Sequence, residues 1–254
     1  MIKEMQLIGK GKAKDLYKTA DGNLLFVFTD RVTAFDGLKK ARVKSKGEIN
    51  CRLSEYWFNL LTDEGIPNHF IKCPTPNTML VQNLKIIPVE VIWRNYIAGS
   101  LWRRYLKHEV EIPEIRSNAT LYEGAQIQGG MIEFTTKFEE VDRPLTPDEI
   151  ISNKWLTEKE IAYLTEITRK INEIMSKKLL EKGIILADFK VEYGKNKDGE
   201  ILLADEVGTP DSCRLWDKTK FEKGEIVSLD KDVFRKNKGD LSVTYRELYE
   251  RIMK

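Results

Sequence analysis

The sequence predicts an α+β protein whose strand-rich first part, about 85 residues long, precedes a larger mixed part. Short β-type segments gather before residue 30 and again between residues 69 and 93. Helical periodicity separates these two groups and returns in a long segment near residues 157–182, which a hairpin pattern follows. We therefore expect two lobes, residues 1–85 and residues 86–254.

The first lobe reads as strands around one helix. QLIGKGKAKDLYKT at 6–19 reads as short strands, and the hairpin signal Asp21-Gly22 precedes the apolar run LLFVF. Apolar residues from Gly47 to Asp63 recur at helical spacing, and Gly65 is a stop signal. HFIKC, TMLVQNL and IIPVEVIW then read as strands, in which Pro88 marks an edge, a bulge or a strand start.

The second lobe has one clear helix and one clear hairpin. Residues 107–150 are rich in Gly, Pro and charge and are interpreted as long loops. Thr157 and Glu160 form a capping box for a helix that ends at Lys182-Gly183. Strands are expected at 184–193 and 200–207, and a short amphipathic helix at 244–252.

Composition limits the function. The chain has 254 residues with 42 Lys+Arg against 40 Asp+Glu, and this +2 balance argues against a nucleic-acid coat or a membrane-surface binder. No apolar run reaches the ~20 residues of a membrane span, and MIKEMQLIGKGK is not a signal peptide. Three scattered cysteines and two lone histidines favour a cytoplasmic protein whose chemistry uses carboxylates, Lys and Arg.

The hairpin IILADFKVEYGKNKDGEILLADEV, residues 184–207, carries the main candidate site. Alternation places Asp188, Lys190 and Glu192 on one face of its first strand. A two-residue turn at Asp198-Gly199 would set Glu192 directly opposite Asp205, unless a bulge shifts the register.

Such a like-charge pair is destabilising unless a cation offsets it, and two carboxylates suit Mg²⁺ with phosphate oxygens. Neutralising Glu192 or Asp205 should then leave the metal-free stability unchanged or higher. The alternative is a solvated charged face that tolerates weak repulsion.

Basic residues gather at three other places. The turn Gly9-Lys10-Gly11-Lys12-Ala13-Lys14 can bring backbone N–H groups and lysines onto phosphates, or it is a plain exposed hairpin. Arg94 ends a strand shortly before Gly99 and Ser100, and Ser100 is read as the N-cap of an anion-binding helix or as an ordinary cap. Thr209–Arg214 is turn-rich and should bring Arg214 close to the Glu192–Asp205 pair.

The stretch KKARVKSK, residues 39–46, carries cations only. It is either a nucleic-acid patch or, more simply, a solvated loop.

GKGKAKDLY, PVEVIWRNYIAGS, LADFKVEYG and DEVGTPDSCRLWD occur in this order and resemble the SAICAR synthetase family, over residues 7 to 246. The resemblance implies an ATP cleft between a nucleotide-binding lobe and the larger lobe. It also implies an ATP-dependent ligase of purine biosynthesis that condenses carboxyaminoimidazole ribonucleotide (CAIR) with L-aspartate.

The resemblance also implies roles for individual residues. ATP would contact Lys10, Gly11, Lys12, Ala13, Lys14 and Glu90, and Mg²⁺ would lie on Glu192 and Asp205. Arg94, Gly99, Ser100, Lys137, Ser212 and Arg214 would bind substrate, and Asp188, Lys190 and Asp211 would be catalytic. Thr136-Lys137 matches a Ser/Thr-Lys pair only in part, and Cys213 stands where relatives often have Ser.

The expected chemistry needs no histidine. ATP would convert the CAIR carboxylate into an acyl phosphate that the aspartate amine attacks, with Asp211 or Asp188 as the general base. A small-molecule kinase is the alternative within ATP chemistry, and a nucleic-acid-binding protein is the alternative outside it. A homodimer is the default expectation for such an enzyme.

Overall fold

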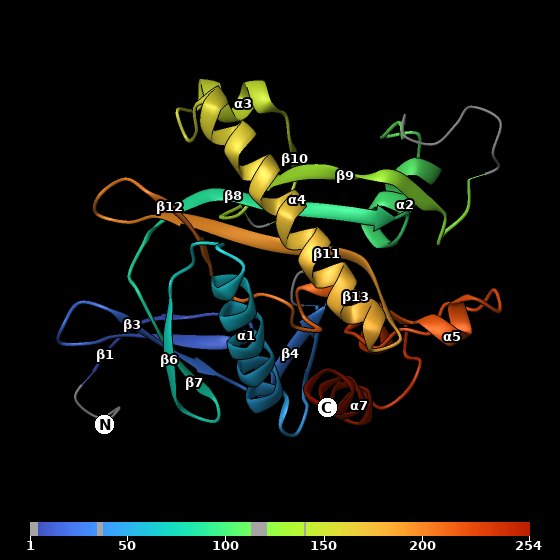
Figure 1. The fold of residues 1–254 in the computed structure, drawn as a ribbon, viewed down its shortest axis with the longest axis horizontal. Coiled ribbons are helices and arrows are strands. Elements are labelled where there is room, and N and C mark those ends of the chain that lie inside the picture. Colours follow the sequence, from blue (N-terminus) through green and yellow to red (C-terminus); the bar gives the residue numbers. More distant parts are fainter. Residues whose placement is uncertain (1–4, 35–37, 113–120, 140) are drawn as a thin grey trace.

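The computed structural model describes residues 5–34, 38–112, 121–139 and 141–254. Its first sheet has five antiparallel strands in the order β1-β2-β3-β7-β6. The strands are β1 (Gln6–Lys10), β2 (Lys14–Lys18), β3 (Leu24–Phe28), β6 (Phe70–Thr75) and β7 (Thr78–Val81). A separate two-stranded ribbon pairs β4 (Arg31–Ala34) with β5 (Lys39–Arg42). Figure 1 shows the five-stranded sheet in blue to teal beside the N-terminus.

The second sheet has six strands in the order β10-β9-β8-β11-β12, with β13 paired to β11. The strands are β8 (Lys85–Tyr96), β9 (Gln126–Thr136), β10 (Pro144–Leu145), β11 (Ile184–Lys195), β12 (Ile201–Ala204) and β13 (Cys213–Asp217). The two longest, β8 and β11, are antiparallel neighbours in its middle. The main core cluster draws buried residues from both sheets, so the division at residue 85 stays a prediction.

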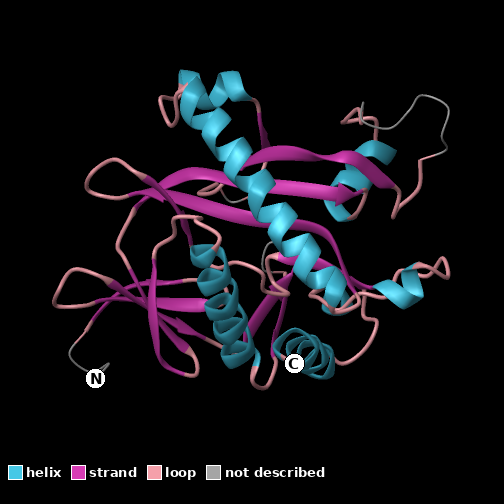
Figure 2. Ribbon diagram, viewed as in Figure 1, coloured by secondary structure: helices cyan, strands magenta, loops and turns pink. Residues whose placement is uncertain are grey.

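Seven helices complete the described part of the chain. They are α1 (Lys46–Asp63), α2 (Gly99–Leu106), α3 (Pro147–Ser152), α4 (Glu158–Glu181), α5 (Lys218–Phe221), α6 (Asp232–Arg235) and α7 (Leu241–Met253). In Figure 2, α4 crosses the second sheet and α1 lies beside the first sheet. Within the described residues, no helix is long and apolar enough to cross a membrane.

The long helix α4 confirms its predicted boundaries. Thr157 and Glu160 form the reciprocal capping box, and the helix ends before Gly183, which has φ +70°. The apolar stripe of α4 is buried against β8 and β11, and the Thr168 hydroxyl lies 2.8 Å from the Tyr193 hydroxyl. The helix therefore covers one face of β11 and leaves the opposite face to the charged residues.

Most other elements also agree with the sequence. The strands of the first sheet, α1 and α7 lie where periodicity and turn signals predicted them. The register of β8 against β11 shifts between Glu192 and Gly194, opposite the segment that holds Pro88, so this proline lies at a bulge in a central strand.

The expectation of long loops over 107–150 is wrong for β9, which has eleven residues. Gly129 and Gly130 interrupt its pattern at φ +80° and +74°, and a Cβ on Gly130 would lie 2.6 Å from the Trp93 Nε1 atom. Residues 113–120 and 140 lie outside the described residues. Glycines inside a strand weaken its sequence signal, which explains why this strand was missed.

The expected register of the β11–β12 hairpin is also wrong. Glu192 pairs with Ala204, because the connection spans residues 196–200 instead of two residues. The Asn196 side-chain oxygen accepts hydrogen bonds from the amides of Asp198 (3.0 Å) and Glu200 (2.9 Å), which closes this longer loop. Asp205 therefore follows the last ladder pair and does not face Glu192 directly.

We predict that Thr157→Ala lowers the melting temperature by about 2–4 °C, because the α4 N-cap contributes about 1 kcal/mol. Thr165→Ala is the matched control, since its hydroxyl only bonds the Ile161 carbonyl within the helix. Thermal melts of both variants check this, and an equal loss in both would show that the cap has no special role.

Candidate active site

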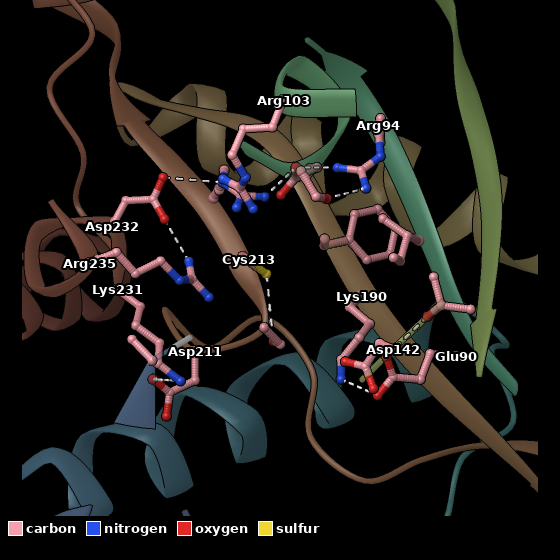
Figure 3. A pocket seen from close by; sticks show the side chains of 18 of the residues that line it. Glu90, Arg94, Arg103, Asp142, Lys190, Asp211, Cys213, Lys231, Asp232 and Arg235 are labelled. Atoms are coloured by element: carbon pink, nitrogen blue, oxygen red, sulfur yellow. Dashed lines mark hydrogen bonds and ion pairs between the residues drawn. The ribbon is translucent and has the colours of Figure 1, made fainter. Parts of the chain in front are cut away.

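A cavity of about 590 Å³ lies against the face of β8 and β11 that α4 does not cover. Figure 3 shows Glu90, Arg94 and Lys190 on one side of this cavity and Asp211, Lys231, Asp232 and Arg235 on the other. Its lining is dominated by charged side chains from β8, β11, α2 and the segments around residues 211–214 and 231–236. This cavity is the candidate active site.

Strand pairing brings the predicted charged residues together. Asp188 lies opposite Arg94, and Glu192 lies opposite Glu90, across the β8–β11 ladder. Phe189, Val191 and Tyr193, which alternate with the charged residues, belong to the main core cluster. The prediction from period two is confirmed, and it explains how side chains that are mostly buried still face a cavity.

An arginine cluster occupies one end of the cavity. Arg94 is 2% exposed and donates to Glu133, to Asp188 at 3.0 Å and to the Ser100 hydroxyl at 3.1 Å. Arg214 donates to the same Asp188 oxygen at 2.7 Å and to Asp232 at 3.2 Å.

Two sequence expectations change at this end. Arg214 pairs with Asp188 and Asp232, and not with Glu192 or Asp205. Ser100 is not the N-cap of α2, since Ala98 holds that position and the Ser100 hydroxyl bonds Arg94. Gly99 has φ +57°, and a Cβ there would lie 2.1 Å from a guanidinium nitrogen of Arg214. Only glycine allows Arg214 to pass so close to the start of α2.

Lys190 occupies the middle of the charged face. Its ammonium group bonds Glu90, whose other carboxylate oxygen accepts from the Thr135 hydroxyl at 3.2 Å. Burial lowers the pKa of a lysine, but the carboxylates of Glu90 and Glu192 outweigh burial and raise the pKa of Lys190. Lys190 is therefore held as a cation at the cavity surface.

Glu192 and Asp205 lie next to this cavity in a cluster with Lys14 and Lys137. Lys137 bonds Glu192, and Lys14 bonds Asp205 at 2.9 Å and Glu206 at 3.2 Å. Asp205 has φ +63°, and its carbonyl oxygen lies 3.2 Å from the Nε2 atom of buried His69. This left-handed turn brings the Asp205 carboxylate back to the lysines after the ladder has ended.

The lysines of this cluster change the expected effect of Glu192–Asp205 repulsion on the metal-free stability. Burial on its own raises the pKa of a carboxyl, but the Lys14 and Lys137 ammonium groups outweigh burial and hold the pKa of Asp205 at about 2. Burial and then the negative charge of Asp205 raise the pKa of Glu192. Lysines therefore offset the like-charge pair, and removal of Asp205 would leave the buried Lys14 without its nearest partner.

The residues of this cluster fit Mg²⁺. Each carboxylate has one oxygen on a lysine, and within the described residues the second Asp205 oxygen accepts no protein hydrogen bond. Mg²⁺ usually takes one or two carboxylates together with phosphate oxygens and water. No group of three or more possible metal-ligating side chains occurs among the described residues.

The glycine–lysine turn connects β1 to β2 near the cluster. The Gly11 amide donates to the Lys14 carbonyl at 2.8 Å, and the Ala13 carbonyl accepts from Thr29. Lys10 and Lys12 are exposed, and Lys12 reaches the cavity lining, whereas Lys14 is buried. Lys12 therefore lines the cavity, whereas Lys14 contacts the carboxylates of Asp205 and Glu206.

Asp211 and Ser212 reach the cavity from the turn before β13. One Asp211 oxygen accepts from Asn50 at 2.9 Å and lies 2.5 Å from the Lys46 ammonium nitrogen, and the other accepts from Tyr245 at 2.8 Å. Burial on its own raises a carboxyl pKa, but Lys46 and Lys231 outweigh it and lower the pKa of Asp211. Asp211 is consequently a weak base.

Sequence reasoning missed several charged residues of the cavity. Arg103 and Arg104 come from α2, and Glu133 from β9 pairs with Arg94 and Arg104. A second group comes from α6 and its flanks: Lys231, Asp232, Arg235 and Lys236. In the segment KDVFRK, Lys231 and Arg235 are four residues apart, a spacing that places two cations on one helix face and could have indicated this group.

Known proteins share this fold and sequence. The sequence profile of SAICAR synthetase matches residues 7–252. A phosphoribosylaminoimidazole-succinocarboxamide synthase from Pyrococcus horikoshii is 43% identical over 253 residues, which cover 99% of this chain and 97% of the relative.

Solved structures of SAICAR synthetases have the same fold as this chain. A SAICAR synthetase in complex with ADP has a TM-score of 0.85 and 41% identity, covering 98% of this chain and 97% of its own. A SAICAR synthase from Saccharomyces cerevisiae complexed with SAICAR has a TM-score of 0.81 and 29% identity, covering 98% of this chain and 94% of its own.

The fold and these relatives define the class of the protein as an ATP-dependent carbon–nitrogen ligase. The chain belongs to the SAICAR synthetase family, the phosphoribosylaminoimidazole-succinocarboxamide synthases of purine biosynthesis.

We predict that Asp205→Asn lowers the metal-free stability at pH 7 by about 1–2 kcal/mol, because Lys14 loses a charged partner. The pKa of Asp205 is lowered from 3.8 to about 2, so its contribution is complete above about pH 4 and is lost as the pH falls towards 2. Melting curves from pH 7 to pH 2, with the exposed Asp198→Asn as control, check this. Equal stability of the two variants at pH 7 would contradict it.

Proposed function

We propose that this chain joins the CAIR carboxylate to the amine of L-aspartate in the cavity against β8 and β11, with ATP as co-substrate. The observation that carries the proposal is the charged face itself, where Arg94, Arg214 and Lys190 meet a cavity of about 590 Å³. Both CAIR and aspartate carry carboxylates, and CAIR and ATP carry phosphates. Fixed cations in a cavity favour such anions.

ATP phosphates would lie between the glycine–lysine turn and the Glu192–Asp205 cluster. Lys10, Gly11, Lys12, Ala13 and Lys14 would surround the phosphates with backbone atoms of the turn and with ammonium groups, and Glu90 holds Lys190 at the cavity. In this proposal Lys14 and Lys137 exchange their carboxylate partners for phosphate oxygens when ATP binds. Glu192 and Asp205 would hold Mg²⁺, which supplies positive charge to the phosphates during transfer.

CAIR would lie at the arginine end. Arg94 and Arg214 present guanidinium groups that suit phosphate or carboxylate, and Ser100 and Gly99 sit beside them at the start of α2. Ser212, whose carbonyl accepts from the Lys190 amide at 2.8 Å, adds a hydroxyl to the same cavity. Arg235 extends the same basic surface.

The reaction then proceeds in two steps. An oxygen of the CAIR carboxylate attacks the γ-phosphorus of ATP, the bond to the β-phosphate oxygen breaks, and ADP leaves an acyl phosphate. The neutral aspartate amine attacks the acyl carbon, phosphate leaves, and the nitrogen loses a proton to give the amide. Lys190 faces the cavity where negative charge develops and stabilises it.

A base must accept the amine proton, and Asp188 suits this role better than Asp211. Both arginine contacts of Asp188 use its Oδ2 atom, whereas both oxygens of Asp211 accept hydrogen bonds. Asp188 lies on β11 at the arginine end, where it also orients Arg94 and Arg214. A carboxylate so placed can take a proton and return it to solvent.

The kinase and the nucleic-acid-binding alternatives are disfavoured by family membership. The basic stretch 39–46 is not a uniform surface patch, since Lys46 is 1% exposed and Lys39 bonds the Phe234 carbonyl. A cytoplasmic location and a homodimer stay predictions.

The direct test incubates the protein with ATP, CAIR and aspartate and follows the amide product and ADP. We expect amide, ADP and phosphate in equal amounts, and no amide when any substrate is omitted. Phosphate release that is independent of aspartate, without amide, would contradict the ligase assignment.

We predict that Asp188→Asn lowers kcat by about 10²–10⁴, the range of general acid–base contributions. The substitution keeps the size of the side chain, so a melting temperature near that of the parent protein would show that the loss is chemical. Asp211→Asn should lower kcat less. The reverse order of the two variants would assign the base to Asp211.

A further inference from the structure

Helix α1 carries a row of buried polar side chains that the proposed chemistry does not use. Lys46, Asn50 and Ser54 follow one another at four-residue spacing, so they share one face of the helix. Lys46 is 1% exposed, and Asn50 and Ser54 are 0% exposed. Lysine is almost never fully buried unless it is paired, so this row requires a specific explanation.

All members of the row contact the segment that follows Asp205. Lys46 and Asn50 both reach Asp211, at 2.5 Å and 2.9 Å. The Ser54 hydroxyl accepts from the Val207 amide at 3.0 Å and donates to the Val207 carbonyl at 3.2 Å. Helix α1 therefore holds the segment that joins the proposed metal end of the site to its substrate end.

The row is not optimised for stability. The Nδ2 atom of Asn50 donates to Asp211, which leaves its Oδ1 atom buried without a hydrogen-bond partner among the described residues. A buried acceptor without a partner is destabilising. The helix thus contains both this orphaned acceptor and the buried ammonium group of Lys46. The Asn50 Nδ2 atom and the Lys46 ammonium group both contact the carboxylate of Asp211.

The second oxygen of that carboxylate connects the row to the cavity. It accepts from the Tyr245 hydroxyl at 2.8 Å, and the Lys231 ammonium nitrogen lies 3.8 Å away, beyond a direct hydrogen bond. Lys231 and Asp211 both line the cavity, as Figure 3 shows, whereas Lys46 is 1% exposed and is not among the lining residues. With Lys46 in place, Asp211 is neutralised and the charge of Lys231 is in excess at the cavity surface.

We propose that Lys46 is a positioning residue. It neutralises the Asp211 carboxylate without lining the cavity, and so keeps the Lys231 ammonium group available to an anionic group of the substrate. This inference rests on the proposed function, because it assigns the anion to CAIR. Without Lys46, Asp211 would draw Lys231 into a full ion pair and remove one cation from the cavity. The phosphate or carboxylate of CAIR would then meet a weaker attraction.

Three variants test this: Lys46→Met, Asp211→Asn and the double variant that combines them. In Lys46→Met we expect the KM for CAIR to rise about 10- to 100-fold, the scale of one lost charge-assisted contact, with a smaller change in kcat. The double variant has no carboxylate to capture Lys231, so we expect its KM to return to within about threefold of the parent protein, since coupled residues are not additive. Lys178→Met, a surface lysine of α4 paired with Glu181, is the matched control.

Each result decides the question. An unchanged KM in folded Lys46→Met, or a double variant with a KM as high as that of the single one, overturns the proposal. If Lys46→Met does not fold, the double variant alone decides, because it lacks the Asp211 charge that Lys46 would otherwise neutralise, and a KM tenfold above the parent protein would refute the role. Amide formation by the parent protein is measured first, so that failure of the proposed function is seen separately.

Discussion

The site depends on the antiparallel pairing of β8 with β11, whose side chains alternate between two different environments. One face packs under α4, while Asp188, Lys190 and Glu192 on the other face meet Arg94 and Glu90. Because these side chains are largely buried, each charge requires a partner. These partners come from the surrounding segments: Lys14 from the first sheet, Lys137 from the position directly after β9, and Arg214 from β13.

This requirement explains how a chain of net charge +2 can hold anionic substrates. Cations and carboxylates of the site are paired with one another in the structure described. In the proposed function, the carboxylates orient the lysines and arginines, and phosphates would then replace the carboxylates as partners. Preorganised charges of this kind need little rearrangement when the reaction develops negative charge.

Features that depend on residues close together in the sequence were predicted correctly. The capping box of α4, the turn at Asp21-Gly22 and the alternation along β11 were all correct, since each depends on neighbouring residues. The β11–β12 register was wrong, because Asn196 closes a longer loop than Asp198-Gly199 suggests. The burial of Lys46 within a basic stretch was also missed. Its partner Asp211 lies far away in sequence, and only the packing of α1 against the 205–212 segment brings the two together.

Lys14 and Lys137 are proposed to exchange their carboxylate partners for phosphate oxygens, and a crystal structure of the protein with ADP and Mg²⁺ would show whether they do. We expect Mg²⁺ to be held by Glu192 and Asp205, with both ammonium groups moved onto phosphate oxygens. Nucleotide bound with both lysines still on Glu192 and Asp205, and with the metal elsewhere, would contradict it.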